Sequence, residues 1–121
     1  MSQDRSIRSQ LSAIQSGWSF RWPGRIIAGT RNALTLREAN YLPVHYIPRG
    51  DVDMTLLERT DHATYCPYQG DCAYYSIPAG GDRSVNAVWT YEDPYEAVAS
   101  IKGHLAFYPD RVSAIEEQAA A

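Results

Sequence analysis

The chain has 121 residues, of which 45% are hydrophobic and 21% are charged, and its formal net charge at pH 7 is −3. This length fits one domain with a single hydrophobic core and excludes a two-domain enzyme with a separate cofactor domain. The acidic balance argues against a nucleic-acid partner, because no basic patch is available to neutralise phosphates. No apolar run approaches the ~20 residues that span a bilayer, so we expect neither a membrane partner nor a secretory leader.

The choice of aromatic and cationic residues is uneven. The chain has nine tyrosines and three tryptophans but two phenylalanines, and Lys102 is the only lysine among 11 basic residues. Tyrosine and tryptophan combine a large apolar ring with a polar tip, so they suit sites that are partly apolar and partly wet.

Cysteine is sparse, with Cys66 and Cys72 alone. A domain of this size folds on its own core, so the pair does not indicate a disulfide scaffold, and we expect a reducing cytoplasm as its location. Two cysteines are too few for a structural zinc site, and His45, His62 and His104 lack the close pairing such sites use. We therefore expect no metal and no cofactor.

Residues 1–17 differ from the rest of the chain. They are rich in Ser, Gln and Arg, and Ile7, Leu11 and Ile14 follow helical spacing up to Gly17, which stands at a possible C-cap. This pattern predicts a short amphipathic N-terminal helix or an arm.

From Trp18 onward apolar and polar residues alternate with the two-residue period of β-strands. Trp18, Phe20 and Trp22 alternate with Ser19 and Arg21, and further strands are predicted at residues 25–28, 33–38 and 44–47.

After residue 48 the spacing of apolar residues changes from that of a strand to that of a short helix. Asp51 is expected to cap a short helix with an apolar face of Met54, Leu56 and Leu57, and residues 61–70 are expected to form a loop. Strands 72–77 and 84–91 follow, joined by a turn at 80–82, then a helical turn over 93–100 and a hairpin of 104–108 with 111–115. Residues 116–121 are expected to be disordered. The sequence thus predicts an all-β fold with short helical insertions, as a single domain over residues 18–115.

The order of the motifs resembles one known family. The motifs are Gly24-x-x-Ile27-Ala28, Leu34-x-Leu36-x-Glu38, Tyr46-x-Pro48-Arg49-x-Asp51-Val52, Thr64-x-Cys66-Pro67-Tyr68-x-Gly70, Ala73-x-Tyr75, Ala87-x-Trp89-x-Tyr91-x-x-Pro94 and Ile101-x-Gly103-x-x-Ala106-Phe107-Tyr108. In this order they resemble the family called domain of unknown function 427, which some classifications label a nucleotidyltransferase family. The resemblance covers roughly residues 18–115 and implies a compact all-β domain related to the Mss4-like, or β-tent, architecture.

The resemblance implies little about activity, because the family has none established to carry over. Gln69 stands where the family pattern usually has a lysine, which argues against phosphate chemistry driven by an ammonium group there. Cys72 is a second departure, since a small or polar residue is more usual at that position.

Arg49, Asp51 and Asp53 form the sharpest polar cluster in the sequence. Two alternating carboxylates on one strand would suit a divalent metal and nucleotide transfer, with Arg49 on a phosphate. The simpler interpretation is that Asp51 caps a helix, Asp53 lies in its first turn and Arg49 pairs with one of them. The simpler interpretation is favoured, because no glycine-rich loop precedes a helix to hold a phosphate.

Cys66 lies before Pro67 and near His62, so a thiolate nucleophile is conceivable, as is a disulfide with Cys72. A buried, unreactive thiol is favoured, because free cysteine usually acts as a small apolar side chain.

Rings crowd the region from Tyr65 to Tyr91. Strand alternation places Trp89 and Tyr91 on one face together with Ala87, and it separates Tyr75 from Tyr74. Such rings suit either a pocket that stacks a planar or cationic ligand or ordinary core packing, and both interpretations remain open.

These observations favour a cytoplasmic domain that binds an unknown small molecule in an aromatic-lined pocket. The alternatives are a nucleotidyltransferase and a protein-interaction module; no catalytic residue is predicted and the oligomeric state is left open. The predicted ligand-binding residues are Arg49, Asp51, Cys66, Tyr68, Gln69, Trp89 and Tyr91.

Overall fold

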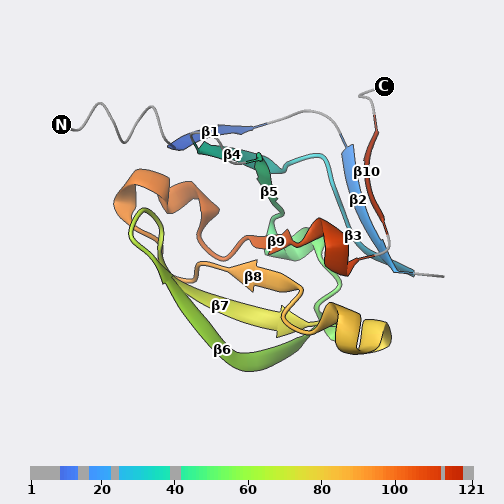
Figure 1. Ribbon diagram of the computed structural model, residues 1–121. Helices are drawn as coiled ribbons and strands as arrows, with labels where there is room; N and C mark the ends of the chain where they lie inside the picture. Colours follow the sequence, from blue (N-terminus) through green and yellow to red (C-terminus); the bar gives the residue numbers. More distant parts are fainter. Residues whose placement is uncertain (1–8, 14–16, 23–24, 39–41, 113, 119–121) are drawn as a thin grey trace.

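Antiparallel strands dominate the chain, as the alternating apolar residues predict. The computed structural model describes residues 9–13, 17–22, 25–38, 42–112 and 114–118. The strands form three sheets (Figure 1): β1 (Ser9–Ala13), β4 (Leu34–Glu38) and β5 (Val44–Tyr46); β10 (Ala114–Gln118), β2 (Gly17–Trp22) and β3 (Arg25–Thr30); and β6 (Glu58–Cys66), β7 (Gly70–Ser76), β8 (Val88–Thr90) and β9 (Leu105–Phe107). Short 3-10 helices connect them: η1 (Arg49–Asp51), η2 (Met54–Leu56), η3 (Pro78–Ser84), η4 (Glu96–Ile101) and η5 (Pro109–Arg111). The predicted all-β fold with short helical insertions is confirmed.

Both ends of the described chain are strands where the sequence predicted otherwise. Ser9–Ala13 do not form a helix but strand β1, which pairs with β4 so that Leu11 lies opposite Leu36. The predicted disordered tail is wrong for residues 116–118, which continue β10 and pair with β2. The remaining parts of these two predictions, residues 1–8, 14–16 and 119–121, lie outside the described residues.

The predicted loop over residues 61–70 is also wrong, because most of it belongs to β6. This strand pairs with β7 around a tight turn in which the Gln69 N–H donates to the Cys66 carbonyl at 3.2 Å. Gly70 follows with φ +110°, a backbone conformation that residues with a side chain rarely adopt without strain. The polar composition that predicted a loop instead marks an exposed edge strand of the sheet.

The helical insertions differ in detail from the prediction. Asp53, and not Asp51, is the N-cap of the turn that contains Met54, and its side chain accepts the Thr55 N–H at 3.1 Å. The predicted turn at 80–82 is part of η3, and the second strand of that pair begins at Val88 instead of residue 84. The helical turn predicted at 93–100 corresponds to η4.

The predicted terminal hairpin does not form. β9 pairs with β8, whereas β10 pairs with β2 in another sheet. The chain between them turns through η5, and Arg83 and Ser84 side chains donate to backbone carbonyls of that region. The two strands therefore belong to different layers although they are close in sequence.

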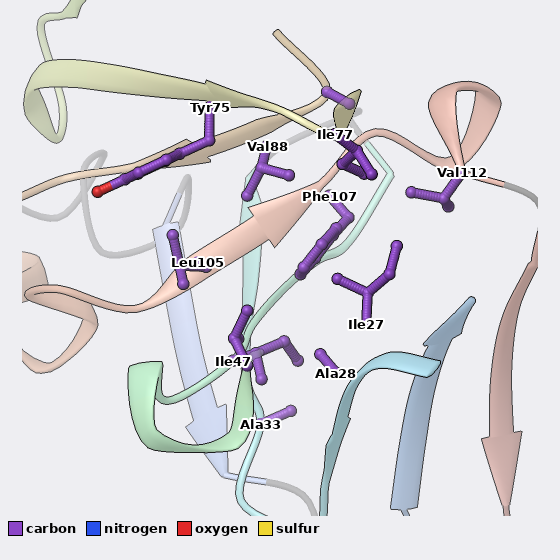
Figure 2. Close-up of a cluster of buried hydrophobic side chains, with 12 residues drawn as sticks. Ile27, Ala28, Ala33, Ile47, Tyr75, Ile77, Val88, Leu105, Phe107 and Val112 are labelled. Atoms are coloured by element: carbon purple, nitrogen blue, oxygen red, sulfur yellow. The ribbon is translucent and has the colours of Figure 1, made fainter. Parts of the chain in front are cut away.

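Two isolated bridges link the sheets to other segments of the chain. Ile47, just after β5, exchanges two backbone hydrogen bonds of 2.8 Å with Leu105 of β9, and Ala28 of β3 pairs with Val52. Buried side chains fill both faces of the four-stranded sheet. Figure 2 shows the cluster on one face, in which Ile27, Ile47 and Phe107 meet, while Tyr75 directs its hydroxyl away from Ile77 and Phe107.

Candidate functional site

The register of β7, β8 and β9 decides which side chains share a face. Tyr74 lies opposite Trp89, and Trp89 lies opposite Ala106. Successive strand residues point to opposite faces, so Tyr75 and Val88 belong to the other side. The buried clusters agree with this division, since Tyr74 and Tyr91 pack in one and Tyr75 and Val88 in the other. We call the first side the aromatic face and the second the apolar face.

A row of rings crosses the aromatic face. The Trp89 ring lies 4.4 Å from the Tyr108 ring and 6.4 Å, edge to face, from the Tyr46 ring. The Trp89 indole N–H donates to the Tyr46 hydroxyl at 3.4 Å, and Tyr46 also lies 6.4 Å from Tyr91. Beyond Tyr108, the Arg111 guanidinium lies 4.8 Å from its ring centre. Trp89 and Tyr108 are half-buried, whereas Tyr46 and Tyr91 are buried, so the row is open to solvent at its Trp89–Tyr108 end.

Two buried phenols of the aromatic face, Tyr91 and Tyr74, have a raised pKa, which favours their neutral form. Burial, and after it the neighbouring Tyr46, raises the pKa of Tyr91 above its ordinary value. Burial likewise raises the pKa of Tyr74, although the Thr64 hydroxyl, 2.9 Å from the phenol oxygen, acts in the opposite direction. The His62 ring lies 4.4 Å from the Tyr74 ring on the same side.

Both predicted thiols lie beside this face. Cys66 is half-buried against the aromatic cluster and Cys72 is buried within it, and neither forms a disulfide. Desolvation raises the pKa of the Cys72 thiol, which disfavours its thiolate. The sequence favoured a buried, unreactive thiol at Cys66, but Cys66 is only half-buried and keeps partial access to solvent at the end of β6. Full burial is found at Cys72 instead.

Tyr68 and Gln69 lie in the turn that follows Cys66. Tyr68 is half-buried, and Gln69 is 3% exposed, with its carbonyl accepting the Tyr95 N–H at 3.0 Å. The turn is thereby fastened to the segment after β8, next to Tyr91 in sequence. The structure thus brings the Cys66–Gln69 turn to the same end of the sheet as Tyr91.

Arg49 lies elsewhere. Its Nη1 atom is 3.5 Å from the Tyr75 hydroxyl and 3.9 Å from the Met54 sulfur, so it lies at the margin of the apolar face. The structure therefore does not bring Arg49 together with Trp89 and Tyr91. The sequence could place residues on alternate sides of a strand, but not the segment after β5 relative to those sides.

The two carboxylates near Arg49 are held by other groups. Asp51 accepts the Thr30 hydroxyl at 2.7 Å, and Asp53 caps its own turn. They do not form a paired metal site, and the expected pairing of Arg49 with one of them is absent from the contacts of these described residues. Among the residues that the structure describes, no three His, Cys, Asp or Glu side chains lie together so as to hold a metal ion.

Several residues of these two surfaces were not singled out from the sequence. Tyr46 and Tyr108 lie within the quoted motifs, so their aromatic character was the available signal. Arg59 and Glu92 form a bidentate ion pair, in which the two guanidinium nitrogens Nη1 and Nη2 lie 2.7 and 2.9 Å from the carboxylate oxygens Oε2 and Oε1. They are far apart in sequence, and only the sheet brings them together.

The comparisons with known proteins agree with the motif order. A family model described as a domain of unknown function, DUF427, and abbreviated NTP_transf_9, matches residues 10–118. The chain belongs to the DUF427 family. Comparison with curated proteins gives no match. The DUF427 match includes most of β1 and all of β10, which supports the inclusion of both strands in the domain. Within the described parts of this DUF427 chain, no helix is long and apolar enough to span a bilayer.

Proposed function

We propose that this DUF427 domain binds a small planar molecule against the half-buried Trp89–Tyr108 pair on the aromatic face. The observation that carries the proposal is this pair itself, since its rings are 4.4 Å apart yet both retain contact with solvent. Aromatic rings stack planar or cationic groups while their polar tips form hydrogen bonds.

Neighbouring contacts support the proposal. Tyr46 lies behind Trp89 and fixes its indole by the N–H···O bond of 3.4 Å, while Arg111 lies beside the Tyr108 ring. Rings fixed in this way lose little conformational freedom when a ligand binds, which favours affinity. Of the residues predicted from the sequence, the proposal keeps Trp89, Tyr91, Cys66, Tyr68 and Gln69 on this side of the sheet. It leaves out Arg49 and Asp51.

The proposal does not include nucleotidyl transfer, the activity that the family abbreviation names. Such transfer needs carboxylates that hold a divalent metal beside the phosphates. Here Asp51 accepts the Thr30 hydroxyl and Asp53 caps η2, so each has a structural partner. We propose a cytoplasmic setting for the binding domain, which the two free thiols support.

A thermal-shift screen tests the proposal with nucleotides, aromatic amines and acyl compounds as probes. A probe at about 100 times its dissociation constant stabilises the folded state by about 2.7 kcal/mol, which corresponds to a rise in Tm of roughly 10 °C or more for this size. We expect Trp89→Ala and Tyr108→Ala to lose most of this rise relative to their own ligand-free Tm.

Tyr65→Ala is the matched control, because Tyr65 is an exposed ring that contacts Tyr95 and lies outside the row. It should keep the full rise. A rise that survives Trp89→Ala, or the absence of any stabilising probe, would contradict binding at this pair; a stable complex with a protein would instead favour the interaction-module alternative.

A further inference from the structure

A charged cluster lies at the margin of the apolar face, on the other side of the sheet from Trp89. Tyr75 is at its centre, with a hydroxyl directed away from the core (Figure 2). Arg49 reaches this hydroxyl from η1, and Arg59 lies directly opposite Tyr75 in the β6–β7 register. Glu92, which follows β8, binds Arg59 through both oxygens. We call these four residues the Arg–Tyr cluster.

Arg49 has unused hydrogen-bonding capacity. A guanidinium carries five N–H donors, and here the two contacts, at 3.5 Å to a phenol and 3.9 Å to a thioether, are both long and neutral. Among the described residues no carboxylate lies within ion-pair distance of Arg49. The side chain is half-buried, so its charge is only partly solvated.

The charges of the cluster do not balance. Arg49 and Arg59 supply two positive charges and Glu92 one negative charge, which leaves one positive charge unmatched. The hydrogen bond from Arg59, and further the charge of Arg49, lower the pKa of Glu92, so both cations act on the same carboxylate. Arg59 already binds one oxyanion in this way, since its guanidinium donates two parallel hydrogen bonds to the Glu92 carboxylate.

We infer that the Arg–Tyr cluster is a binding site for an oxyanion, the carboxylate or phosphate group of a small molecule, held by Arg49, Arg59 and the Tyr75 hydroxyl. Glu92 competes with that oxyanion for Arg59. The site lies on the opposite face from the proposed planar-ligand site and does not depend on it.

Titration of the protein with sodium acetate and with inorganic phosphate tests the inference. Ionic strength is held constant with sodium chloride, and binding is followed by the NMR signals of the arginine Nε–H groups. We expect saturable shifts at Arg49 and Arg59 with at least one of the two probes; preference between them assigns the carboxylate or phosphate group. If neither probe gives saturable shifts, the inference is wrong.

Three substitutions distinguish this site from general charge attraction. Arg49→Gln should weaken binding roughly tenfold or more, the effect of one charge-assisted hydrogen-bonded contact. Glu92→Gln should strengthen binding, because it releases Arg59. Arg31→Gln removes an exposed arginine that is not one of the four cluster residues and should leave the affinity unchanged.

Two outcomes would overturn the inference even if a probe binds. One is an affinity that falls in Glu92→Gln, and the other is an affinity that Arg49→Gln and Arg31→Gln reduce equally. If Arg49→Gln fails to fold, Arg49→Lys keeps the charge without the planar fork and should still weaken binding. Trp89→Ala should not change the acetate or phosphate affinity, so the two proposed sites can fail separately.

Discussion

The role of Asp51 can be decided by a double-mutant cycle with Thr30. The Thr30 hydroxyl donates to the Asp51 carboxylate at 2.7 Å, and Thr30 is 7% exposed. A hydrogen bond to a charged group contributes about 1.5–3 kcal/mol to stability. We therefore expect Asp51→Ala and Thr30→Val each to lower the free energy of unfolding by about that amount. The double variant should lose less than the sum, with a coupling energy of about 1–2 kcal/mol.

Urea denaturation at pH 7, followed by circular dichroism, measures all four corners of the cycle. Thr30 also accepts the Asn32 N–H at 3.0 Å, but that bond is absent in both Thr30→Val proteins and so cancels from the coupling. Asp53→Ala is the matched control, since it removes a cap worth about 1 kcal/mol and should add to Thr30→Val within ~0.5 kcal/mol. A Thr30–Asp51 coupling below ~0.5 kcal/mol would refute the structural role. Metal-dependent turnover of a nucleotide that Asp51→Asn abolishes without loss of stability would refute it as well.

Three further predictions concern the hairpin, the thiols and the ion pair. Gly70→Ala should cost about 1–3 kcal/mol of stability because φ is +110°, whereas Gly50→Ala, which meets open space, should be nearly neutral in the same denaturation assay. Iodoacetamide at pH 8 should label Cys66 well before Cys72 in the native protein, because Cys72 is buried and its pKa is raised; equal rates by mass spectrometry would contradict this. The pKa of Glu92 is lowered, so its stabilising contribution is present above the unfolded value of 4.5 and is lost as pH falls below it. This contribution is measured by comparing urea midpoints at pH 7 and pH 3.5 in wild type and Glu92→Gln. If the wild type loses no more stability at low pH than the variant does, the Glu92 carboxylate makes no such contribution.

Alternation of apolar and polar residues along the chain was enough to predict several of the strands. Phe20 and Leu36 belong to strands of the predicted kind because polar residues separate their apolar neighbours. Strand β6 escaped prediction since it is an edge strand exposed along most of its length, and its side chains show no apolar period. Strand β1 was mistaken for a helix because its pairing with β4, a contact made at long range, overrides the weak local spacing of Leu11.

Only the part of the candidate site that follows regular strand alternation could be predicted from the sequence. Trp89 and Tyr91 share a face, as predicted, but Ala87 packs on the opposite side. Alternation fails at Ala87 because Asn86 before it has φ +52° and interrupts the strand. Arg49 could not be assigned to either side from sequence, since its place depends on the bridge between Ile47 and Leu105.

Asn86 also holds β8 in the register that places Trp89 on the aromatic face and Val88 on the apolar face. Its N–H donates to the Ser76 hydroxyl at 2.9 Å, its side chain accepts from Thr60 at 2.6 Å, and its carbonyl accepts from Arg111 at 3.2 Å. These contacts fasten the start of β8 to three other segments of the chain. A slip of one residue would exchange the faces of Trp89 and Thr90 and so place an indole against the apolar core. The left-handed turn at Asn86 therefore fixes the register on which both proposed sites depend, although it belongs to neither.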